Sequence, residues 1–144
     1  MRNILLVSVN GFTFKACLLI TCLWMSFFAQ AKDSTSIETA RAWLKLVDSG
    51  QYVQSWQQTD HIFQTATPEP KWRLALEQLR IPLGRVMSRT YFDVQEYSSL
   101  PGMPNGEYLV VQFQTSFTNK EHALETLSLS KNSGQWQPLG YLIN

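Results

Sequence analysis

Apolar residues follow two different spacings along the chain, and the change from one to the other predicts the architecture. In the first part they recur at every third or fourth position, as on one side of an α-helix. This spacing predicts three helices, over about 35–48, 51–63 and 70–80. Each predicted helix carries one tryptophan on its apolar side, and we expect all three rings in the core: Trp43, Trp56 and Trp72.

Beyond Gly84 the apolar positions fall on every second residue, which is the period of a β-strand. Strands are predicted over about 86–97, 107–117, 124–130 and 135–143, joined by short turns. The second has the clearest alternation, with an inward set of Leu109, Val111, Phe113, Thr115 and Phe117. In the last, Pro138 indicates a sheet edge. Three helices before four strands predict an α+β fold, with the helices packed on one face of a four-stranded antiparallel meander.

The first 31 residues have the pattern of a cleavable signal peptide. A short apolar block follows Lys15 and ends in Ala29-Gln30-Ala31, the small-x-small pattern of a cleavage site. We therefore expect cleavage after Ala31, a periplasmic or secreted product and a single domain over 32–144. The alternative is a retained membrane anchor, although the block is shorter than the roughly 20 apolar residues that a span needs.

Composition removes several classes of function. The whole chain has a formal charge of +1, so nothing favours nucleic acid or an anionic lipid surface as a partner. Both cysteines, Cys17 and Cys22, lie in the predicted leader, so thiol chemistry is excluded from the mature domain. The two histidines, His61 and His122, fall in different predicted elements, and we expect neither a metal site nor a cofactor.

Nearly the whole predicted domain resembles a bacterial family, the domain of unknown function 4019. The resemblance implies an exported bacterial protein, most often periplasmic, and carries over no activity. The order of elements also resembles the cystatin-like, nuclear-transport-factor-type fold, which hosts enzymes, carriers and dimerisation modules alike. The family resemblance rests on Ala42-Trp43-Leu44, Val47-Asp48-Ser49-Gly50-Gln51-Tyr52, Ser55-Trp56, Trp72, Arg80-Ile81-Pro82-Leu83-Gly84, Arg89, Leu100-Pro101-Gly102, Gly106-Glu107-Tyr108, Phe113-Gln114-Thr115, Phe117, Asn119-Lys120, Glu125-Thr126 and Gly140-Tyr141.

The first predicted strand offers a candidate binding face. Strict alternation would place Val86, Phe92 and Val94 against the helices and turn the other side of the strand toward solvent or a partner. That other side consists of Arg85, Met87, Arg89, Tyr91 and Asp93. The two arginines would lie about 13 Å apart, too far to hold one carboxylate together.

A second interpretation is a small-pocket lyase or isomerase. Asp93 or Glu107 would act as a base and Tyr91 or Tyr108 as a proton donor, provided that burial raised the pKa of the carboxyl group. The chain has no phosphate-binding loop, nucleophile elbow or zinc-protease helix. The sequence therefore favours a non-enzymatic module that binds an envelope protein or a small ligand and, after cleavage, does not stay in the membrane.

Overall fold

A computed structural model of the protein describes residues 34–144, and the predicted signal peptide with its cleavage point at Ala31 lies outside them. The described chain begins with an N-terminal helix over residues 34–48. Three further helices follow, α2 (Tyr52–Gln57), α3 (His61–Ala66) and α4 (Glu69–Arg80). None of the described helices is long and apolar enough to span a membrane.

The single helix predicted over 51–63 is two short helices, because the chain turns at Thr59 and Asp60. The Asp60 carboxylate accepts a hydrogen bond from the backbone N–H of Ile62 and so caps α3. The backbone N–H of Asp60 donates to the carbonyl of Pro138, 2.8 Å away. This bond joins the start of α3 to the sheet, which a continuous helix could not do.

Four strands form the second half of the described chain: β1 (Val86–Tyr97), β2 (Tyr108–Phe117), β3 (Lys120–Ser130) and β4 (Gln137–Ile143). They pair antiparallel in the order β1-β2-β3-β4, so the predicted meander is confirmed. β4 is an edge strand, as Pro138 indicated. The fold class is α+β, with four helices in residues 34–144 where the sequence predicted three.

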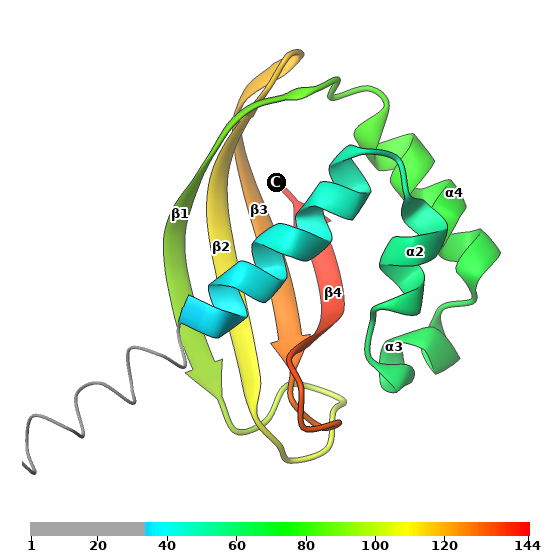
Figure 1. Ribbon diagram of the computed structural model, residues 1–144, viewed down its shortest axis with the longest axis vertical. Helices are drawn as coiled ribbons and strands as arrows, with labels where there is room; N and C mark the ends of the chain where they lie inside the picture. Colours follow the sequence, from blue (N-terminus) through cyan, green and yellow to red (C-terminus); the bar gives the residue numbers. More distant parts are fainter. Residues whose placement is uncertain (1–33) are drawn as a thin grey trace, which may run out of the picture. The chain divides into compact units, whose positions relative to one another are not determined.

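The helices cover one face of the sheet. Figure 1 views the sheet from that side, with the N-terminal helix in cyan crossing the strands and α2 to α4 standing beside β4. The core between these layers contains Trp43, Leu44 and Trp72 from the helices, together with Leu109 and Phe113 from the predicted inward set of β2. The Trp43 and Trp72 ring centres are 6.1 Å apart, so these two tryptophans also pack against each other, while Trp56 lies partly buried at the side of the core.

β1 does not alternate strictly, and its predicted faces are correct only in part. Val94 packs on the core and Asp93 lies on the other side, as predicted, whereas the placing of Arg89, Tyr91 and Phe92 was wrong. Its pairing with β2 shifts between Val86 and Ser88 and again between Tyr91 and Asp93. Each shift inserts one extra residue, Met87 or Phe92, opposite the partner strand, and each reverses the side to which the following side chains point. A sequence period cannot show such insertions, because it assumes one residue per step.

Candidate functional site

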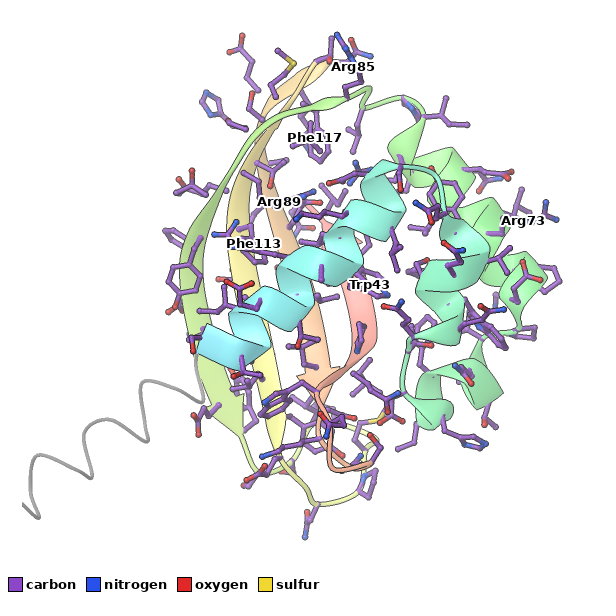
Figure 2. The ribbon with its side chains drawn as sticks, viewed as in Figure 1. Trp43, Arg73, Arg85, Arg89, Phe113 and Phe117 are labelled. Carbon is purple, nitrogen blue, oxygen red and sulfur yellow. The ribbon has the colours of Figure 1, made fainter. Side chains whose placement is uncertain are left out.

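The structure separates the four candidate binding residues of β1. Arg89 and Tyr91 pair with the inward residues Thr115 and Phe113 and therefore face the helices. Figure 2 shows Arg89 between the strands and the N-terminal helix, and Arg85 at the end of the sheet. Asp93 pairs with Gln112 and lies on the opposite face.

Arg89 holds two carboxylates at once, although the sequence predicted that it lies on the face turned toward solvent or a partner. Its Nε and Nη2 donate to the two oxygens of Glu125 on β3 at 2.6 and 3.1 Å. Its Nη1 and Nη2 donate to the two oxygens of Asp48, at the end of the N-terminal helix, at 2.7 and 2.9 Å. Both pairs are bidentate, the strongest geometry that a guanidinium and a carboxylate can form.

A second arginine completes this cluster from α4. Arg80 donates from Nη1 to Glu125 at 3.2 Å and from Nη2 to Asp48 at 2.9 Å. Glu125 also accepts hydrogen bonds from the hydroxyls of Thr115 and Tyr141, both at 2.5 Å. We call these six residues the charge cluster: Asp48, Arg80, Arg89, Thr115, Glu125 and Tyr141.

The charge cluster is arranged for holding elements together and not for moving protons. Two cations face two anions, and Glu125, only 1% exposed, has five donors around its two oxygens. Burial opposes the charge on Arg89, but its hydrogen bonds to Asp48 and Glu125 outweigh this and raise its pKa. Burial and the nearby Glu125 charge raise the pKa of Tyr141, so its hydroxyl stays protonated. A carboxylate saturated in this way is a poor general base.

The residues named for acid–base chemistry are not assembled. Tyr91 and Asp93 lie on opposite faces of the sheet because the bulge at Phe92 stands between them. Glu107 pairs with Lys131 at 3.2 Å. The Tyr108 hydroxyl donates to the carbonyl of Pro104 at 2.7 Å and so fixes the loop before β2.

The described residues contain no group of three or more His, Cys, Asp or Glu side chains that could hold a metal ion. His61 is exposed on α3, where its ring contacts the Thr65 hydroxyl, while His122 is exposed on β3.

The face of the sheet turned away from the helices is the second feature of interest, and we call it the open sheet face. The register assigns to it the residues of each strand that do not contribute to the core. Its acidic members are Asp93 and Glu121 and it has no lysine or arginine, whereas Phe92 and Leu142 are 53% and 47% exposed. Its members are Ser88, Thr90, Phe92, Asp93, Gln95, Tyr97, Val110, Gln112, Gln114, Ser116, Glu121, His122, Leu124, Thr126, Ser128, Gly140 and Leu142.

A groove of about 790 Å³ lies on this face near the turn between β2 and β3. Thr90, Gln114 and Leu124 form one row across it, since each pairs with the next in the sheet. Asn144 continues the row, as its backbone exchanges two hydrogen bonds with Leu124 at 3.1 Å. Phe92 and His122 also line the groove.

Several residues of the charge cluster occupy positions that the sequence already predicts to face inward. Glu125 has the same parity as the inward Leu127, and Thr115 the same parity as Phe113. Arg80 follows Leu76 by four residues on one stripe of α4. A charged residue at an inward position predicts a buried partner of opposite charge, although it does not say which one.

Comparison with known proteins places the chain in a family. The family described as Protein of unknown function (DUF4019) matches residues 39–141, so the chain belongs to it, as the resemblance in the sequence indicated. A search of curated proteins gives no match.

Proposed function

Because the chain belongs to a family without an assigned activity, we propose from its geometry that the protein is a non-enzymatic binding module of the cell envelope. It presents the open sheet face to an envelope protein or to a small ligand. The export of the protein and its periplasmic location belong to the same proposal and rest on the leader pattern of residues 1–31.

One observation carries the proposal: a whole sheet face is uncovered by helices and nearly free of charge. Binding surfaces are depleted of charged residues and enriched in aromatic ones, and this face combines the exposed ring of Phe92 with two carboxylates, those of Asp93 and of Glu121 in the groove lining. The buried charged side chains have fixed partners: those of the charge cluster pair with one another, and the Asp60 carboxylate accepts hydrogen bonds from the Ile62 N–H and the Ser130 hydroxyl.

Site-specific photo-crosslinking in cells tests this use of the face. We would compare Phe92→p-benzoylphenylalanine with Leu74→p-benzoylphenylalanine, because Leu74 on α4 is 55% exposed and Phe92 53%. The proposal expects a discrete adduct from position 92 and none from position 74. Equal adducts from both positions would contradict the use of this face. No adduct from position 92 would reject an envelope protein as the occupant and leave the small ligand, which the titration below tests.

Cell fractionation tests the export. The proposal expects the protein in the periplasmic fraction, with an amino terminus that begins just after Ala31. Recovery of the intact chain in the membrane fraction would support the retained anchor instead.

A further inference from the structure

The groove of the open sheet face points to an occupant, and we infer that it binds a neutral, hydroxyl-rich ligand, a saccharide. This inference rests on the proposed function and deepens it by naming the chemistry of the ligand. The groove has a volume of about 790 Å³, within the roughly 300–1,000 Å³ that is usual for small-molecule sites.

The charges around the groove select a neutral ligand. Its lining contains no lysine or arginine, and the only titratable side chains in it are Glu121 and His122. A phosphate or carboxylate group would find no permanent cation to pair with there. A strongly cationic ligand would find one carboxylate, on a residue at the rim of the sheet near the turn.

The polar side chains of the groove also argue against an apolar ligand. Thr90, Gln114, His122 and Asn144 make no side-chain hydrogen bond within the described chain, so their donors and acceptors face solvent or a ligand. Covering these groups with hydrocarbon would remove their water without replacing its hydrogen bonds. A ligand that both donates and accepts, as every sugar hydroxyl does, replaces that water directly.

Phe92 supplies the remaining element, an exposed aromatic ring beside the polar row. It is the extra residue of the second bulge in β1, and the pairing shift places it at the groove while Tyr91 packs against Phe113 on the helix side of the sheet. Pyranose rings have an apolar side made of C–H groups, and such a side packs against the face of an aromatic ring. An amide and hydroxyl row next to one exposed ring therefore matches both sides of a sugar.

The same features fit a protein partner less well. Protein interfaces have a core of several buried apolar side chains, whereas the groove offers only Phe92 and Leu124. A second copy of the chain or another protein on this face is accordingly an alternative outcome of the experiment below.

The experiment titrates cellotetraose, chitotetraose and maltotetraose separately into the isotope-labelled full-length protein and follows backbone amide shifts by NMR. We expect at least one of them, at up to about 10 mM, to shift amides of the groove and to leave the helices unchanged. Phe92→Ala is expected to weaken that binding about tenfold, and Gln114→Ala about threefold to tenfold. The control Leu74→Ala, which changes an equally exposed side chain far from the groove, leaves the affinity unchanged.

Absence of groove shifts with all three saccharides overturns the inference, and so does binding that Phe92→Ala and Leu74→Ala weaken equally. A protein adduct from position 92 in the crosslinking experiment, combined with no saccharide binding, keeps the proposed function and rejects the saccharide. Groove shifts that appear on concentrating the protein alone indicate a second copy and likewise reject it.

Discussion

Arg89 on β1 forms a bidentate pair with Glu125 on β3, although β2 lies between them. The bond from Nε to Oε2 is 2.6 Å, and the pair is buried, with side-chain exposures of 10% and 1%. Two strands that share no backbone hydrogen bonds are thereby joined through their side chains. The same Arg89 extends to Asp48 and so includes the N-terminal helix.

Removing the negative charge of Glu125 is expected to destabilise the fold strongly. Glu125→Gln keeps the shape of the side chain but leaves the buried guanidiniums of Arg80 and Arg89 without one of their two anions. Breaking a buried ion pair in this way costs about 3–5 kcal/mol. Urea unfolding measures the loss, and the exposed Glu121→Gln on the same strand is the control, with a change within about 0.5 kcal/mol. Similar losses in both variants would show that the charge cluster carries no special weight.

The geometry of Arg89 matters beyond its charge. Arg89→Lys keeps a cation but cannot form two bidentate pairs, because an ammonium group is a single point of donation. We expect a loss of about 2 kcal/mol or more in the free energy of unfolding. The matched control is Arg73→Lys on α4, whose exposed pair with Glu69 at 3.7 Å is a surface contact. A lysine tolerated equally well at both positions would refute the bidentate argument.

Tyr141 makes stability depend on alkaline pH. Its pKa in the folded protein is raised by burial and by Glu125, whereas in the unfolded chain it ionises near pH 10. The unfolded state therefore loses this proton first, and the stabilisation from Tyr141 is complete below about pH 10 and declines above it. Between about pH 8 and pH 11, the wild-type protein should lose about 1.4 kcal/mol more than Tyr141→Phe does.

Urea unfolding of both proteins across that pH range measures the difference. Parallel pH dependences of the wild-type protein and Tyr141→Phe would contradict the assignment. The other tyrosines are present in both proteins, so their ionisation cancels in the comparison.

Two glycines with the same φ allow the cost of backbone strain to be distinguished from the cost of a steric clash of the added Cβ. Gly84 and Gly102 both have φ of +76°, a conformation that costs other residues about 1–2 kcal/mol. A Cβ on Gly84 would lie 3.1 Å from the Cβ of Thr118, whereas one on Gly102 meets nothing within 4 Å. We expect Gly84→Ala to lower the thermal midpoint clearly more than Gly102→Ala, as calorimetry can measure. Equal shifts would mean that the turn at Thr118 moves aside without cost.

The arrangement of layers was predictable because apolar residues recur with a different period in the helices than in the strands. The inward set of β2 that includes Phe113 and Phe117 is buried throughout, as its alternation indicated. The faces of β1 were not predictable, because the bulges at Met87 and Phe92 leave no periodic mark.

The sequence predicted the inward positions of part of the charge cluster but not which residues pair there. The inward parity of Glu125 was visible, but its partners Arg80 and Tyr141 come from separate elements, 45 and 16 residues away. Local spacing relates residues within one helix or strand, and it cannot choose among charged side chains on different ones. The groove was hidden for the same reason, since its row crosses three strands and includes the residue at the carboxyl end of the chain.

Because of the bulge at Phe92, the exposed residue at this position can change independently of the inward-facing residues of β1. Because Arg89 anchors the interior and Phe92 stands outside the regular register, an exchange at position 92 leaves the interior anchor in place. Relatives of this chain could therefore vary the exposed side chain at this position without losing the buried ion pairs that join their elements, and a designer could change the exterior of the scaffold in the same way.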